Sequence, residues 1–433
     1  MISLIRITKR YPAGLFLVAL FLAVAIPEAC AQTSYTWDQV KAKFEASNPA
    51  LKADADNVDE MKAEEITAYL RPNPQVGLTV DGTQIAPNKG VWEPLTGTFV
   101  VPSISYLHER DHKRELRLES AQEGTRITQS QHEDLDRNMV FSLRTAFVAT
   151  LQAKFVLDLA KADLEYYDHI IQISQDRFKA GDMAQIDLDR IELLRVQYES
   201  ELQMAIVNLR TAKIQLLQML NEPTPVDQFD VTGTFDFSDA LQPLETYRDA
   251  ALAARPDLQA ALQTIQQSET NHKLAISNGS TDPTYSAWYT WNSSNNNPET
   301  DDSQTLGLSV SIPLRIFDRN QGEKKRTLID IDRSQQASAA TRAQVFSDVD
   351  TAYAEVQSNI ELLKPYKAQY NAQALRVRDT VTYAYQHGGA SLMDFLNAQS
   401  DYRQVQLAYA QLIGAYLTAA AQLNLAVGRE VIP

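Results

Sequence analysis

The chain has 433 residues, with 40 Lys and Arg against 55 Asp and Glu, a formal net charge of −15 and one cysteine. This acidic balance argues against a nucleic-acid partner, because neutralising phosphates requires clustered Lys and Arg. Only 15 residues are glycine, and Ala, Gln, Leu and Asp are abundant. That composition favours long helices over an ordinary globular fold.

The N-terminus has the features of a secretory signal peptide. Three basic residues precede an uncharged apolar run over residues 13–26, and Ala29-Cys30-Ala31 follows it. We expect residues 1–31 to be removed by cleavage after Ala31. The alternative is a lipoprotein signal with Cys30 acylated, against which Pro27 and Glu28 count. No later apolar stretch approaches 18 residues, so no transmembrane helix is expected.

The rest of the sequence contains one unit written twice. Gly181 and Gly388 are 207 residues apart, and the same separation relates Asp187 to Asp394 and, near the front of each unit, Pro49 to Pro256. The period is far too long for a solenoid. We predict two structural repeats, residues 32–225 and 245–433, joined by an irregular linker over residues 226–244.

Each repeat is predicted to begin with a helix and two strands. Residues 37–70 are helical by pattern with a break at Asn48-Pro49, and Pro72 and Pro74 end the segment. Alternation of apolar with small or polar residues predicts strands at about 75–83 and 98–106, then at about 284–292 and 305–313. Their length suits tilted membrane strands, but it also suits hairpins in a soluble sheet. The polar loop 293–304 must lie in water.

Long helices are predicted over about 109–221 and 320–428, each folded back at a glycine turn. Proline is almost absent from these stretches, apart from Pro365. Apolar residues recur at three- and four-residue steps from Phe395 to Leu423, which indicates coiled-coil packing against neighbouring helices. Asn320 followed by Glu323 predicts a capping box where the second long stretch begins.

The two turns between long helices hold the candidate functional residues. Glycine there supplies the positive φ that ends a helix, and acidic residues favour the start of the next helix. These residues are therefore either helix caps alone or, in a closed oligomer, a ring of carboxylates that gates a pore. The candidate gate residues are Asp182, Asp187 and Asp394, and the candidate contact residues of the turns are Gly181, Gly388, Gly389 and Ser391.

Nothing in the sequence indicates an enzyme, a cofactor or a metal site. Of the six histidines, only His108 and His112 have metal-ligand spacing, and they lack a Glu after the first His and a third ligand. Nucleophile-elbow, phosphate-loop and dinucleotide-binding glycine patterns are also missing.

Several motifs together resemble the outer-membrane efflux protein family typified by TolC. The run from Tyr385 to Gln399 is similar to that family's closing pattern. With the segments 71–74, 254–258 and 312–322, the chain is most similar to the branch that serves heavy-metal cation efflux. The motifs are weak singly, but their order and spacing are specific.

The resemblance implies a mainly α fold with a small β part. Three chains would close a 12-stranded outer-membrane β-barrel that continues into a periplasmic α-helical barrel. This passive duct would contact a periplasmic adaptor and an inner-membrane pump of the RND type. The cargo would be metal cations, or alternatively small toxic compounds. From the residues alone, a soluble periplasmic coiled-coil adaptor or scaffold remains the alternative.

Overall fold

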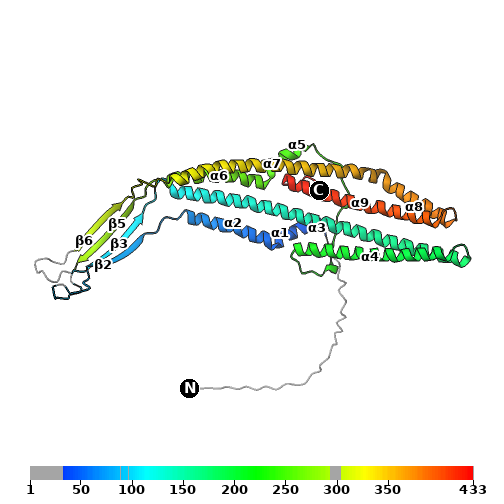
Figure 1. The fold of residues 1–433 in the computed structure, drawn as a ribbon, viewed down its shortest axis with the longest axis horizontal. Coiled ribbons are helices and arrows are strands. Elements are labelled where there is room, and N and C mark those ends of the chain that lie inside the picture. The colour runs from blue at the N-terminus through cyan, green and yellow to red at the C-terminus, as the bar shows by residue number, and fades with distance from the viewer. Residues whose placement is uncertain (1–32, 88, 96, 293–303, 433) are drawn as a thin grey trace, which may run out of the picture.

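The computed structural model describes residues 33–87, 89–95, 97–292 and 304–432. The chain is a long rod, with a β-sheet at one end and two helical turns at the other (Figure 1). The predicted signal peptide and most of the polar loop lie outside the described residues. Several buried clusters run along the rod in place of one central core.

The helices repeat with the period of the sequence. The first repeat contains α1 (Trp37–Ser47), α2 (Pro49–Ala68), α3 (Lys113–Ala180) and α4 (Gln185–Met219), and the second contains α5 (Leu244–Ala254), α6 (Pro256–Ser277), α7 (Gln321–Pro365), α8 (Asn371–Gln386) and α9 (Leu392–Val427). A shift of 207 residues carries both ends of α1 onto α5. The same shift carries the first residue of α4 onto that of α9, so the structure is duplicated like the sequence.

A proline at the first helical position starts the second helix of each repeat. Pro49 and Pro256 hold this position in α2 and α6, where a missing N–H costs nothing. The Asn48 side chain caps α2 by accepting hydrogen bonds from the backbone N–H of Ala50 (2.9 Å) and Leu51 (3.2 Å). The break expected at Asn48-Pro49 is confirmed.

Four strands form one antiparallel sheet at the end of the rod. Its order is β2 (Gln75–Asp81), β3 (Phe99–Leu107), β5 (Thr284–Asn292) and β6 (Gln304–Ser311). Trp288 interrupts the small and polar face of β5, and it pairs with Gly307 on β6. A Cβ on Gly307 would lie 2.2 Å from the Trp288 ring. The glycine therefore makes the space that the indole occupies.

The linker between the repeats is more ordered than the sequence suggested. It contains a 3-10 turn, η1 (Val226–Gln228), and a strand, β4 (Phe229–Val231), which pairs in parallel with β1 (Thr33–Tyr35). Phe229 and Val231 are buried in the cluster that includes Phe44 of α1. The linker thus holds residues 33–35 against the buried cluster around Phe44.

The capping box expected at the start of α7 was wrong. Asn320 precedes α7 with a left-handed φ of 61°, and its side chain donates to the carbonyl oxygen of Ala275 (2.8 Å) instead of capping the helix. The sequence showed no apolar stretch near 18 residues, but among the described residues α3 and α9 are long and apolar enough to cross a membrane by length and composition alone. In the apolar 18-residue window of α9, 61% of the residues are buried, as in a helix packed among others.

The long stretch in the second repeat is interrupted once, at its proline. α7 ends at Pro365, a π-helical turn, η2 (Tyr366–Tyr370), follows, and α8 then continues. Proline lacks the backbone N–H that an α-helix uses and clashes with the preceding turn, so the local hydrogen-bond pattern widens. Asp158 takes the place of Pro365 in the first repeat, and α3 runs through it unbroken.

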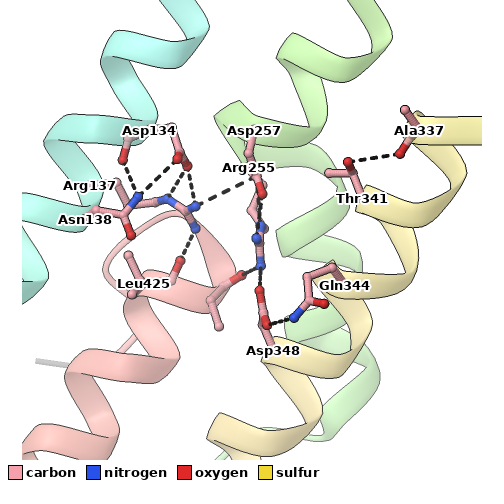
Figure 2. Close-up of polar contacts among 11 residues, drawn as sticks. Asp134, Arg137, Asn138, Arg255, Asp257, Ala337, Thr341, Gln344, Asp348 and Leu425 are labelled. Carbon is pink, nitrogen blue, oxygen red and sulfur yellow. Dashed lines mark hydrogen bonds and ion pairs between the residues drawn. The ribbon is translucent and has the colours of Figure 1, made fainter. Parts of the chain in front are cut away.

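A buried arginine links three helices of the second repeat, α6, α7 and α9 (Figure 2). Arg255 lies between α5 and α6 and is 4% exposed. Its guanidinium donates to both carboxylate oxygens of Asp257 (3.0 and 2.6 Å), to Asp348 of α7 (2.8 Å) and to the carbonyl oxygen of Ala426 on α9 (3.3 Å). One side chain therefore binds three helices.

Arg137 of α3 extends this network into the first repeat. It donates to Asp134 and to the carbonyl oxygen of Leu425, and it lies 3.9 Å from the Asp257 carboxylate (Figure 2). One repeat earlier, Asn48 takes the place of Arg255 and donates to the carbonyl oxygen of Met219 (3.3 Å). Met219 is the counterpart of Ala426, so the same backbone link exists in both repeats.

We predict that Arg255→Met destabilises the protein by about 3–5 kcal/mol, because it leaves Asp257 and Asp348 without their buried partner. Chemical denaturation of the purified protein, followed by circular dichroism, measures the loss. Arg326→Met is the matched control, since Arg326 pairs with Glu323 in solvent, and it should change stability little. Equal midpoints for the two variants would contradict the role given to Arg255.

Candidate functional site: the helix tips

The turn between α3 and α4 closes by a glycine-dependent hydrogen-bond pattern. Gly181 has a φ of +83° and donates its N–H to the carbonyl oxygen of Phe178 (3.0 Å), while Asp182 donates to that of Arg177 (2.9 Å). This is a Schellman-type ending, which requires the left-handed backbone at the glycine. The Asp182 side chain is left exposed.

The turn between α8 and α9 closes in the same way. Gly388 has a φ of +77° and donates to the carbonyl oxygen of Tyr385 (3.2 Å), and Gly389 donates to that of Ala384 (2.7 Å). Both turns are exposed at the far end of the rod from the sheet (Figure 1).

The helices that follow the two turns differ in their caps. Ser391 caps α9: its hydroxyl accepts from the backbone N–H of Asp394 (3.1 Å), and the Asp394 carboxylate accepts from the backbone N–H of Ser391 (3.2 Å). The Ser391 hydroxyl also donates to the Asp394 carboxylate (2.7 Å), and this bond together with the one from the Ser391 N–H holds the pKa of Asp394 below its ordinary value. In α4 the same position is Ala184, which cannot cap, although Asp187 already stands three residues later.

An apolar cluster and one arginine hold the two tips together. The cluster contains residues of α3, α4, α8 and α9, the four helices that meet at the tips: Ile170, Ile171, Ile191, Tyr385, Leu392 and Phe395. Arg177 of α3 donates to the carbonyl oxygen of Tyr385 (3.1 Å) and lies 5.3 Å from the centre of its ring. The structure thus brings both candidate turns to one end of the molecule.

The three candidate gate carboxylates have different surroundings. Asp182 is exposed at the turn, Asp187 is half-buried and lies 3.9 Å from Arg190, and Asp394 is exposed but engaged with Ser391. Asp182 is therefore the least constrained of the three. Its counterpart in the second repeat is Gly389, so the two tips present unequal charge.

A buried charge network that sequence reasoning missed lies above the tips. Asp163 of α3 is 4% exposed, and its carboxylate lies 3.4 Å from Arg403 of α9. Arg403 also pairs with Glu201 of α4 and lies 5.0 Å from the ring centre of Tyr198. No local motif marks these residues, because they come from three different helices.

Two carboxylates share one guanidinium in this network. Burial raises the pKa of Asp163 to about 6, the nearby Arg403 opposes this rise, and the Glu201 carboxylate adds to it. Asp163 is therefore a group near the tips whose charge changes in mildly acidic conditions. Among the described residues there is no group of three or more His, Cys, Asp or Glu side chains that could hold a metal ion.

Comparison with known sequences gives a family and a relative. Residues 247–429 match the family described as outer membrane efflux protein. The chain is 22% identical to the cobalt-zinc-cadmium resistance protein CzcC of Cupriavidus metallidurans over 393 residues. The aligned region covers 88% of this chain and 87% of that protein.

Solved structures share the fold over nearly the whole length. CusC, described as undergoing transmembrane channel formation, has a TM-score of 0.76 at 16% identity, with 91% of this chain and 92% of that chain covered. The Campylobacter jejuni CmeC outer membrane channel has a TM-score of 0.72 at 14% identity, with 98% and 95% covered.

The duplicated rod with its terminal sheet is the fold of outer-membrane efflux channels. The family match of residues 247–429, the similarity to CzcC and the shared fold confirm the resemblance to outer membrane efflux proteins that the motifs carried. These findings favour an efflux channel over a soluble adaptor or scaffold.

We predict opposite effects from exchanging the caps of the two tips. Ser391→Ala should destabilise the first turn of α9 by about 1 kcal/mol, and Ala184→Ser should stabilise that of α4 by completing a capping box with Asp187. Hydrogen exchange at the two helix starts measures both changes. The prediction fails if exchange at α4 is not slowed by the new serine.

We predict that Asp163→Asn removes part of the pH dependence of stability. Because the folded pKa of about 6 lies above the ordinary 3.8, the folded state holds the extra proton. Stability then falls as pH rises from about 4 to 7, by about 2 kcal/mol. Thermal unfolding at pH 5 and 7.5 should show a smaller difference for Asp163→Asn than for wild type. Asp168→Asn, an exposed change on the same helix, should leave the difference intact.

Proposed function

We propose that the chain is the outer-membrane channel of a tripartite efflux system and acts as a passive homotrimeric duct. Each copy would contribute both repeats, residues 32–225 and 245–433, with 226–244 as the link between them. The observation that carries this proposal is that the rod has two uncovered long edges, one belonging to each repeat.

The sheet leaves one strand uncovered on each side. β2 and β6 are its outer strands, so each has a row of unpaired backbone groups. One face of these strands is apolar and exposed, and consists of Val76, Leu78, Val80, Leu306, Leu308 and Val310. Exposed apolar strands with free edges are stable when the edges pair and the apolar face meets lipid.

The helices continue the same two edges. On one side α2 and α4 each pack mainly against α3, and on the other α7 and α8 pack against α6 and α9. Large apolar residues are exposed along the first edge on α4 at Ile186, Leu193, Val196, Met204, Val207 and Ile214, and along the second at Leu328, Ile329, Leu362, Leu375, Val377 and Tyr383. Such surfaces favour burial against another chain.

A ring satisfies both edges at once. Joining the β6 edge of one copy to the β2 edge of the next preserves the antiparallel alternation, because successive neighbours in the sheet are antiparallel. Four strands cannot close alone, whereas three copies supply twelve strands. The helices would then line a tube in the periplasm below the membrane.

A channel placed in this way would work with two partners, an inner-membrane pump and a periplasmic adaptor. A passive duct needs a pump in the inner membrane, proposed to be of the RND type, and a periplasmic adaptor that contacts the open tips. We assign adaptor contact to Gly181, Gly388, Gly389 and Ser391, and gating to Asp182, Asp187 and Asp394. The mature chain would begin after Ala31, which removes Cys30.

Metal cations are the proposed cargo. The support is the similarity to a protein named for cobalt, zinc and cadmium resistance, together with the acidic charge of the chain.

The proposal is tested by isolating the protein from the outer-membrane fraction and measuring its mass and its conductance in planar bilayers. We expect trimers that conduct. A strain lacking the gene should become sensitive to Co²⁺, Zn²⁺ or Cd²⁺ and recover when the gene is restored.

A soluble monomer in the periplasmic fraction would contradict the duct itself. Conducting trimers from a strain with unchanged metal tolerance would retain the duct and reject the cargo. Organic toxic compounds would then be the next class to examine in the same strain.

A further inference from the structure

The internal repeat supplies a template for the contact between copies. Inside the chain, α3 of the first repeat packs against α6 of the second. By the repeat, α7 is the counterpart of α3 and α2 is the counterpart of α6. The same packing between copies therefore places α7 of one chain against α2 of the next, and both of these helices lie on the uncovered edges.

Hydrogen bonds between α3 and α6 set the register of this packing. The hydroxyl of Ser120 donates to the side-chain oxygen of Asn271 (2.7 Å). Moving the first residue forward by one repeat, and the second back by one repeat, places Thr327 at the same height along the helices as Glu64 of the neighbouring copy, while the Thr327 side chain itself faces α6.

A second hydrogen bond gives the same register further along. The hydroxyl of Ser130 donates to the side-chain oxygen of Gln263 (3.1 Å). The same two shifts make Ala337 level with Asp56 of the neighbour. The two helices would then run antiparallel over at least this length.

One face of α7 is already occupied within the chain. Thr327 bonds to His272 (2.9 Å) and Ser334 to Ser268 (2.9 Å), so these buried residues face α6. Lys325 and Ile329 are exposed and project from the opposite side of the helix. This opposite side is the one available to a second chain.

The two faces brought together have opposite charges. Asp56, Glu60 and Glu64 are exposed on α2, and none forms an ion pair in the described part of the chain. On α7, Lys325 is exposed and likewise unpaired, and the Arg333 side chain is 72% exposed and bonded only to its own helix. The exposed Asp332 lies on the same side, which still leaves this face with a net positive charge. In the derived register, Lys325 lies near Glu64, and Arg333 lies near Glu60.

We propose that the acidic face of α2, formed by Asp56, Glu60 and Glu64, docks on the basic face of α7, formed by Lys325 and Arg333, in a second copy of this chain. The contact rests on the proposed trimer and specifies its register. It is head-to-tail, since two different surfaces meet, and such a contact closes a ring when the rotation fits.

Disulfide trapping tests the register. In a Cys30→Ser background the chain has no other cysteine, so the pair Ala63→Cys and Ile329→Cys can be introduced cleanly. Both positions are exposed and nearly level in the derived register. Oxidation of membranes should yield covalent dimers and trimers on non-reducing gels. The pair Ala63→Cys and Gln357→Cys, whose second site lies farther along α7, should not link.

Charge reversal tests the chemistry. Glu60→Lys with Glu64→Lys places like charges together and should speed trimer dissociation in detergent by about tenfold. Adding Lys325→Glu and Arg333→Glu should restore the wild-type rate. Asp158→Lys with Asp176→Lys makes the same charge change on exposed sites of α3 and should leave the rate unchanged.

The outcomes separate this inference from the proposed function. Wild-type protein that never forms trimers would reject the duct. Trimers that neither link through positions 63 and 329 nor respond to charge reversal would reject this docking and leave the duct standing. Cross-linking through the control pair would place the helices in a different register and also overturn the proposal.

Discussion

The structure depends on one constraint, which is that long helices and strands must be covered along both sides. A strand edge with free backbone groups, or a helix of many turns with an apolar stripe, is stable only beside a partner. The chain meets this need for α3, α6 and α9 within itself. It leaves the need unmet at β2, α2 and α4 on one side and at β6, α7 and α8 on the other, so assembly completes the fold.

The helices are held together by different contacts at the two ends of the rod. Near the sheet, the seams between α3, α6 and α7 are lined by small polar residues such as Ser130, Ser268 and Ser334, which hydrogen-bond across the helices. Near the tips, the seam is aliphatic and aromatic, as at Ile191 and Phe395. The first kind fixes register through directional bonds, whereas the second tolerates sliding because apolar contact is non-directional.

The sequence was sufficient for features that are local or periodic. Strand alternation, proline-limited helix ends and the glycine turns follow from neighbouring residues, so they could be predicted. Arg255 was noted in the sequence only as part of a motif, and its ion pair with Asp348 could not be predicted because the two residues are 93 positions apart. The pairing of Asp163 with Arg403 joins still more distant helices. The strand at Phe229 was missed since three residues carry no periodic signal, and Asn320 showed that a capping pattern can yield to a left-handed backbone.

Pro365 gives the proposed tube a symmetry lower than its repeat suggests. A π-turn adds a residue to the helical path, which rotates everything beyond it by roughly 100° around the axis. In the first repeat Asp158 stands at this position, and α3 continues through it as an uninterrupted α-helix. Around the bore, continuous helices (α3) would alternate with helices interrupted by a π-turn (α7 and α8). The flexibility of the tube would therefore have threefold rather than sixfold symmetry. A partner that docks at the tips would meet two kinds of helical hairpin, and only the hairpin formed by α8 and α9 would bend at a π-turn.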